Sequence, residues 1–182
     1  MKNTGTFSVK TPTDREIVMT RIFDAPRSFV YGAWTKAEHV AHWWDPSGVP
    51  LAVCEIDLRP NGAFRWVNRG PGGVEYPFTG TYREITPPER LVFATRMFPS
   101  SPESVGTLVF TEESGKTKLT MTIECSSIED RDALLKMRVD AGTGRTMENL
   151  AEYLHKIADK AARSNGFSAT VTWVQPVDIN EY

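Results

Sequence analysis

The feature that most constrains this chain is a change in hydrophobic period along its length. From Val53 to Cys125 apolar and polar residues alternate, and short turns rich in glycine and proline divide this stretch into six segments. Alternation with a period of two is typical of strands that bury one face of a sheet. Apolar residues on both sides of this stretch recur at helical spacing instead. The pattern therefore predicts an antiparallel meander flanked by helices.

One further strand and two short helices are expected before the meander. Residues 15–23 alternate as a strand does, and residues 27–44 carry apolar side chains at helical spacings. Asp24 is expected to cap the first helix. Thr35 is expected to cap the second, with Glu38 completing a capping box.

The C-terminal part of the chain is expected to be helical. Ser126 and Glu129 form a capping box before one helix, and an apolar stripe predicts a long amphipathic helix over roughly Thr143–Arg163. The glycines of "AGTG" predict a kink or a break before it, because a helical glycine costs roughly 1 kcal/mol. The expected fold class is α+β, with a curved, seven-stranded antiparallel sheet wrapped around the long C-terminal helix and two short helices after the first strand.

Composition limits the classes of function. The 182 residues fit one main domain, and 21 Lys and Arg against 23 Asp and Glu leave a net charge of −2, so we expect no nucleic-acid partner. We expect no membrane span, since no apolar run approaches about 20 residues, and the first ten residues lack the apolar core of a signal peptide. Cys54 and Cys125 are too few for a disulfide scaffold. A reduced, cytoplasmic protein without a cofactor is expected.

The stretch "HVAHWWDPSG" after the second helix raises two hypotheses. In the first, His39, His42 and Asp45 bind a metal ion, since imidazole and carboxylate suit zinc or iron. However, Asp45 falls where the helix stops, and "DPSG" is typical of a turn, so we predict no metal site. In the second, Trp43 and Trp44 form one wall of a gap between the sheet and the long helix, where a small molecule binds.

Several segments, taken in order, resemble one superfamily. They are "REIVMTRIFDAPRSFVYGAWT", "HWW", "VCEIDLRPNGAFRWVNRG", "GTYREITPPERLVF" and "RDALLKM" followed by "ENLAEYL". These segments, within residues 13–160, are similar to the START-like (SRPBCC, birch-pollen-allergen-like) superfamily, and more closely to the branch named after the activator of the heat-shock protein 90 ATPase. The resemblance implies a helix-grip fold with a hydrophobic cavity. It specifies function weakly, because the superfamily includes lipid carriers, polyketide cyclases, resistance proteins and cochaperone domains.

The chain departs from this pattern at the start of the long helix. Many relatives have Gly-Trp where this chain has Gly144–Arg145. An arginine near a cavity mouth is suited to pair with an anionic group of a ligand, or with Glu124 or Asp57. The alternative is that Arg145 points to solvent.

The two ends of the chain lie outside the resemblance. We expect an N-terminal extension over residues 1–12, a START-like domain over residues 13–163 and a β-prone tail over residues 164–182. The tail is suited to cover the sheet or to pair with a second copy in a homodimer, and partial disorder is the third option.

Binding of a small hydrophobic or amphipathic molecule between sheet and helix is the predicted function. No Ser-His-Asp or Cys-His motif supports covalent catalysis, so we expect a non-enzymatic protein. A chaperone-associated protein-binding module is the alternative that the resemblance suggests, and a cyclase- or hydrolase-like enzyme is the third. The expected ligand-binding residues are Trp43, Trp44, Phe64, Trp66, Phe78, Tyr82, Phe93, Phe110, Met121, Met137 and Arg145.

Overall fold

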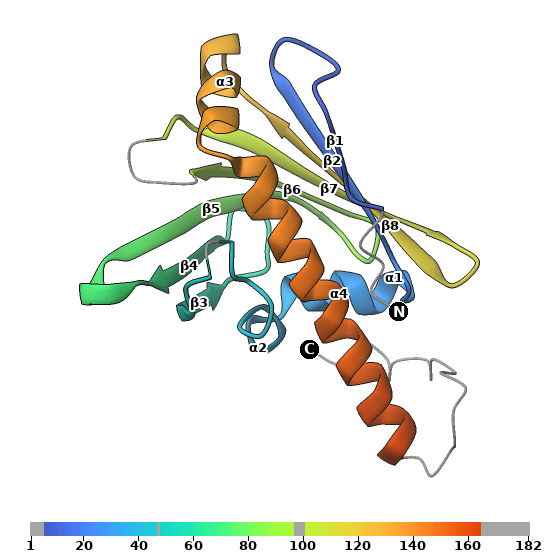
Figure 1. Cartoon of the computed structure of the whole chain (residues 1–182). Helices are drawn as coiled ribbons and strands as arrows, with labels where there is room; N and C mark the ends of the chain where they lie inside the picture. The colour runs from blue at the N-terminus through green and yellow to red at the C-terminus, as the bar shows by residue number, and fades with distance from the viewer. Residues whose placement is uncertain (1–5, 47, 97–100, 165–182) are drawn as a thin grey trace.

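A curved antiparallel sheet and a long helix that crosses its concave face form the framework (Figure 1). The computed structural model describes residues 6–46, 48–96 and 101–164, with side chains up to residue 160. The strands are β1 (Ser8–Lys10), β2 (Glu16–Phe23), β3 (Leu51–Ile56), β4 (Ala63–Arg69), β5 (Glu75–Thr86), β6 (Arg90–Arg96), β7 (Ser104–Glu113) and β8 (Lys116–Glu124). The helices are α1 (Arg27–Thr35), α2 (Ala37–Val40), α3 (Ile128–Lys136) and α4 (Val139–Ser164), with a 3-10 turn η1 (Pro71–Gly73).

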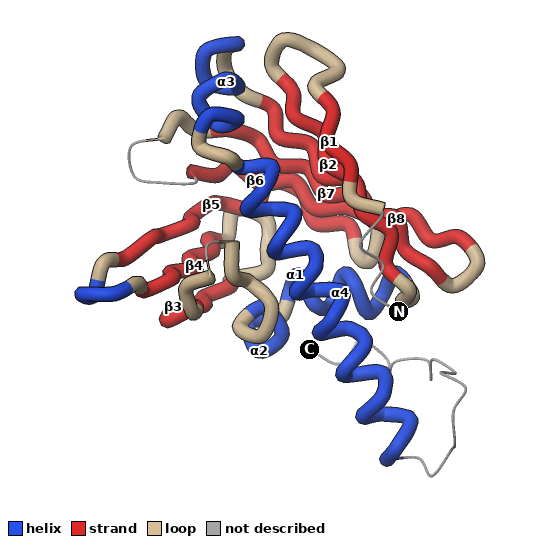
Figure 2. Tube along the Cα trace, viewed as in Figure 1, coloured by secondary structure: helices blue, strands red, loops and turns tan. Residues whose placement is uncertain are grey.

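The sheet has the strand order β1-β2-β8-β7-β6-β5-β4-β3, and each strand runs antiparallel to its neighbours (Figure 2). β2 and β8 lie side by side because the first long strand pairs with the last, with Met19 opposite Met121. The predicted α+β helix-grip fold is confirmed, but the sheet has eight strands among the described residues instead of the expected seven. The additional strand, β1, pairs with β2 and lies in the segment predicted to be an extension.

Alternating burial explains where the core forms. In β2 the side chains at positions 17, 19, 21 and 23 are buried, and those between them are more exposed. α4 contributes a stripe of buried side chains, Met147, Leu150 and Leu154, to the same cluster as the aromatic residues of the sheet. This spacing of three and four residues places one apolar helix face against the sheet.

The predicted position of the break is wrong: the chain breaks between α3 and α4 at Met137 and Arg138, where Arg138 has a φ of +60°, and α4 runs through "AGTG" from Val139 to Ser164. A Cβ atom at Gly142 would lie 3.5 Å from the carbonyl oxygen of Pro46, and one at Gly144 would lie 3.2 Å from the ring of Phe7. The contact at Gly142 is an ordinary van der Waals distance, whereas Gly144 lets the ring of Phe7 approach the helix closely. Packing of this kind offsets the low helix propensity of glycine.

The local cap that was predicted for α1 is also wrong. Pro26 occupies the N-cap position, and Asp24 instead pairs with Lys116 through a 2.7 Å contact between its carboxylate and the ammonium group. The first helical N–H group, that of Arg27, donates to Oε2 of Glu112 on β7 at 2.6 Å. A carboxylate from a distant strand therefore replaces the local cap.

The caps of α2 and α3 differ from the prediction as well. The hydroxyl of Thr35 donates to the carbonyl of Tyr31 at 2.9 Å, so Thr35 closes α1 and Lys36 precedes α2. In α3 the cap is Ser127, whose hydroxyl accepts the N–H of Asp130 at 3.1 Å. The helix begins one residue later than expected because Cys125 is still hydrogen-bonded to Arg15 beside the sheet.

None of the helices in the described part of the chain is both long and apolar enough to cross a membrane. The predicted tail beyond residue 164, and with it the homodimer hypothesis, lies outside the described residues.

Candidate ligand-binding cavity

A cavity of about 720 Å³ lies between the sheet and the first part of α4. Its walls come from the concave face of β4 to β8, from the loop after α2, and from α3 and the first turns of α4. Small-molecule sites in proteins have volumes of roughly 300–1,000 Å³ and are lined mainly by apolar and aromatic groups. The cavity therefore has the size and composition of a ligand site.

Three contacts hold the middle of α4 and leave its first turns free to form a cavity wall. Arg21 of β2 contacts Glu148 at 3.0 Å, the amide of Asn149 donates to the carbonyl of Trp43 at 3.4 Å, and the hydroxyl of Tyr153 lies 2.6 Å from Nδ1 of His39. All three contacts lie after residue 147, whereas the α4 residues that line the cavity lie between residues 139 and 147.

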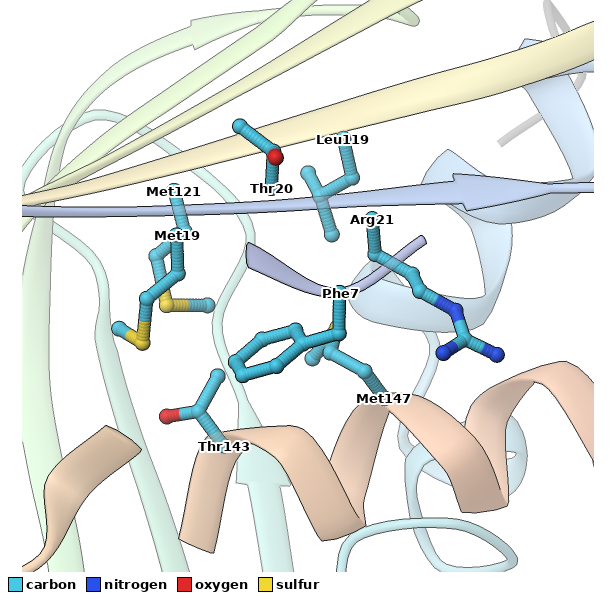
Figure 3. A pocket seen from close by; sticks show the side chains of 8 residues that line it. All are labelled: Phe7, Met19, Thr20, Arg21, Leu119, Met121, Thr143 and Met147. Carbon is cyan, nitrogen blue, oxygen red and sulfur yellow. The ribbon is translucent and has the colours of Figure 1, made fainter. Parts of the chain in front are cut away.

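The side of α4 that faces β1 and β2 is closed. The ring of Phe7 lies between the strands and the helix beside Met147, and the side chain of Arg21 points toward α4 (Figure 3). Only a void of about 10 Å³ remains there. This is about the smallest volume that holds one water molecule, so ligand-sized space lies on the other side of the helix.

The two adjacent tryptophans have different positions. Trp43 is buried in the core, where its Nε1–H donates to the carbonyl of Ala33 at 3.0 Å. Trp44 lines the cavity, stacks on Phe78 with ring centroids 5.0 Å apart, and donates from Nε1 to Oδ1 of Asn68 at 3.1 Å. Consecutive residues leaving a helix end point in different directions, and one of the two indoles thus becomes a cavity wall.

The structure brings some of the predicted ligand-binding residues to the cavity and places the others in closed core. Lining residues from the predicted set are Trp44, Phe78, Phe93, Met121, Met137 and Arg145. The residues of the set that do not line it are Trp43, Phe64, Trp66, Tyr82 and Phe110, each buried in the main hydrophobic cluster. α1 and the indoles cover this second group, as the edge-to-face contact of Phe110 with Tyr31 shows at a centroid distance of 5.4 Å.

Sequence reasoning missed other lining residues, which are Trp34, Pro46, Val49, Asn68, Tyr76, Thr95, Gly106, Ile123, Leu134, Arg138, Val139, Ala141, Gly142, Thr143, Thr146 and Met147. Alternation was a usable signal for those on strands, such as Tyr76 in phase with Phe78 and Ile123 in phase with Met121. Asn68 is in phase with Phe64 and Trp66, and Thr95 is in phase with Phe93. No periodicity identifies the residues of the loop and of the first helical turns, since their position depends on how α4 lies on the sheet.

Several polar groups of the wall are engaged within the protein, whereas the buried Nε1–H of the lining residue Trp34 has no hydrogen-bond partner among the described residues. Asn68 also donates to the carbonyl of Val49 at 2.8 Å, Thr95 donates to Thr79 at 2.9 Å, and Thr146 donates to Gly142 at 2.7 Å. Apart from Tyr76, the ionisable side chains of the lining are two arginines, Arg138 and Arg145. The wall therefore offers an apolar surface with positive charge.

Among the described residues that line the cavity, no nucleophile lies beside a general base. Neither cysteine lines it, and burial raises the pKa of the Cys54 thiol to about 11, so this thiol stays protonated at neutral pH. Burial likewise raises the pKa of Tyr31 to about 12. In the described ranges, no three His, Cys, Asp or Glu side chains lie close enough together to hold a metal ion.

Comparison with known proteins gives the same fold. Among solved structures, a Rhodobacter sphaeroides protein has 22% identity and a TM-score of 0.78 over 83% of this chain and 99% of its own. A Nitrosomonas europaea protein has 24% identity and a TM-score of 0.73 with the same coverages, 83% and 99%. A Chromobacterium violaceum protein has 26% identity and a TM-score of 0.65 over 75% of this chain and 95% of its own. A search among curated proteins finds no match.

The family described as "Activator of Hsp90 ATPase homolog 1-like protein" matches residues 24–155. This range extends from the residue after β2 into the second half of α4 and includes every described residue that lines the cavity. It covers well over half of the 182 residues. The chain therefore belongs to the Activator of Hsp90 ATPase homolog 1-like family.

Proposed function

We propose that this protein binds a small hydrophobic or amphipathic molecule in the cavity between the sheet and α4. The observation that carries the proposal is the cavity of about 720 Å³, whose wall is mainly aromatic and aliphatic. Transfer of apolar surface from water into such a site supplies roughly 25 cal/mol per Å² buried. Binding and not catalysis is proposed because no nucleophile and base meet in this wall.

The position of Trp44 makes the proposal testable with a contact quencher. 11-Bromo-1-undecanol is a neutral amphiphile whose bromine quenches indole emission at contact. We expect it to quench tryptophan fluorescence in a saturable manner and to raise the melting temperature, because a ligand that binds only the folded state stabilises it by about 2.7 kcal/mol at 100 times its Kd. The proposal fails if this ligand changes neither the emission nor the melting temperature.

The adjacent indole provides a matched control. Trp44→Phe keeps an aromatic wall but removes one of the two indoles that line the cavity, the other being Trp34, so part of the quenching should disappear while the rise in melting temperature remains. Trp43→Phe removes an indole of the closed core. The brominated alcohol should quench the emission of this variant about as much as that of the wild type. Equal quenching in both variants would mean that the ligand does not bind at this wall.

The family description supports a second function, the binding of a chaperone partner. Measurement of the ATPase rate of purified Hsp90 with and without the protein separates the two functions. A rise in that rate, together with no effect of the brominated alcohol on the protein, would favour the partner-binding function. Quenching by the alcohol without a change in the ATPase rate would favour the ligand-binding function.

A further inference from the structure

The cavity has a polarity gradient from its exposed to its buried lining. The lining residues Tyr76 and Met137 are 43% and 50% exposed, and the side chain of Arg138 is 71% exposed, so they mark the mouth. The aromatic lining residue Phe93 is buried. The charged lining side chains are therefore exposed, and the buried part of the lining is uncharged and mainly apolar, with Asn68, Thr95 and Thr146 as its polar members.

Two arginines provide the charge at the mouth. Arg138 lies directly before α4, and Arg145 is in its second turn. Arg145 is exposed and makes no hydrogen bond or ion pair with the described residues, whereas Arg138 makes a 3.4 Å contact with Asp140. Among the described lining residues none is a carboxylate, and Asp140 pairs with Arg138 alone, so the described part of the mouth has a net positive charge although the whole chain has a net charge of −2.

The loop after α2 makes room for Arg145. A Cβ atom at Gly48 would lie 2.8 Å from Nη1 of Arg145, so the guanidinium lies directly against this glycine. Gly48 has a backbone φ of +78°, a conformation that residues other than glycine rarely adopt. A larger residue would displace the guanidinium, and the glycine therefore allows the charge to lie at the edge of the cavity.

From this gradient we infer that the ligand is an amphipathic anion, with its apolar tail in the cavity and its anionic head group at Arg138 and Arg145. A guanidinium group donates paired hydrogen bonds to an oxyanion, and the buried, mainly apolar lining takes up a chain without polar groups. The inference rests on the proposed function and specifies its ligand class.

The head group is tested with three probes of equal chain length: undecanoate, 1-undecanol and undecylammonium. Their Kd values are measured by displacement of 11-bromo-1-undecanol at low ionic strength. We expect undecanoate to bind roughly tenfold more tightly than undecanol, as hydrogen bonds to charged groups allow, and the ammonium ion to bind most weakly. Added salt should reduce the advantage of undecanoate, because the arginines are exposed and screened.

The arginines are tested by substitution. The double variant Arg138→Gln, Arg145→Gln should lower the affinity for undecanoate to that for undecanol and leave the affinity for undecanol unchanged. The matched control, Arg59→Gln, Arg83→Gln, removes two positive charges that do not line the cavity and whose side chains are 74% and 51% exposed. It should preserve the preference for undecanoate.

The apolar tail of the ligand is tested with carboxylates of increasing chain length. Each added methylene should improve the Kd about fourfold until the cavity is full. If the acid and the alcohol bind equally to the wild type, or if the control loses the preference as the double variant does, the head-group assignment is wrong while the proposed function stands. If none of the three probes binds, both are wrong.

Discussion

Two aromatic rings of the core pack directly over glycines of the neighbouring strands. Gly80 lies opposite Phe64 in the pair β4–β5, and Gly106 lies opposite Phe93 in the pair β6–β7. A Cβ atom at either glycine would lie 2.4 Å from a ring carbon of that phenylalanine. A ring placed over a cross-strand glycine covers its backbone. At the scale of single residues, these glycines decide where the rings of Phe64 and Phe93 lie.

Gly106→Ala should destabilise the protein and narrow the cavity. The added methyl group forces the ring of Phe93 away from β7, and overpacking of this kind typically costs about 1–3 kcal/mol. Chemical denaturation measures the change in the free energy of unfolding. Gly32→Ala in α1 is the matched control, because no atom lies within 4 Å of its Cβ position, and it should stabilise by roughly 0.5–1 kcal/mol. A stable Gly106→Ala variant would contradict this account of Phe93.

At the scale of elements, the beginning of α1 depends on a strand far away in the sequence. The N–H of Arg27 is satisfied by Glu112, which is 85 residues later in the chain and belongs to β7. In α3 the cap is local, through Ser127. The residue that caps α3 is adjacent in the sequence and could be predicted from it. The residue that caps α1 comes from β7 and reaches the helix only after the sheet has formed.

Glu112→Ala should therefore weaken α1. Loss of a side-chain cap costs about 0.5–2 kcal/mol, and thermal unfolding together with hydrogen exchange at Arg27 to Val30 would measure it. The neighbouring residue is a suitable control. Glu113 is exposed and forms no side-chain hydrogen bond or ion pair with the described residues, so Glu113→Ala should change stability by less than about 0.5 kcal/mol. Equal effects of the two substitutions would mean that Glu112 does not cap the helix.

At the scale of the whole molecule, α4 has two roles: its buried stripe packs into the core, and its first turns line the cavity. The part of α4 after residue 147 is held by Glu148, Asn149 and Tyr153, and one side of the first turns lines the cavity. The contact of Tyr153 with His39 joins α4 to α2. Burial lowers the pKa of His39 below its ordinary value of 6.5, although Glu38 opposes this shift. Part of the stability of the molecule should therefore depend on pH.

The direction of this pH dependence follows from proton binding to His39. Below about pH 6.5 the unfolded chain takes up the proton on His39 before the folded protein does, so the free energy of unfolding falls as the pH falls. Melting temperatures at pH 8 and pH 5 should therefore differ more for the wild type than for His39→Gln. His155→Gln, at a side chain that is 66% exposed, should behave like the wild type. An unchanged pH dependence in His39→Gln would contradict this assignment.

Periodicity and turn chemistry determined the elements of this protein. The strands from β2 to β8 and the long helix could be predicted because period two and period 3.6 are local properties of the chain. β1 was not predicted, since three residues are too few to show a pattern and depend on β2 for pairing. The glycines of α4 misled the prediction because their contacts with Pro46 and Phe7 are tertiary.

The location of the cavity was decided by the tertiary structure. The sequence indicates that Trp43, Trp44 and Trp66 are apolar, but it does not tell which indole faces an open space and which is enclosed. That distinction depends on the angle at which α4 crosses the sheet and on the cover that α1 provides, and both result from contacts between residues far apart in the chain. Likewise, the sequence indicated Arg145 as a candidate ligand-binding residue through its departure from the family pattern, but nothing in the sequence marked Arg138. The two arginines become the charged mouth of an apolar cavity only because the fold places the first turns of α4 there.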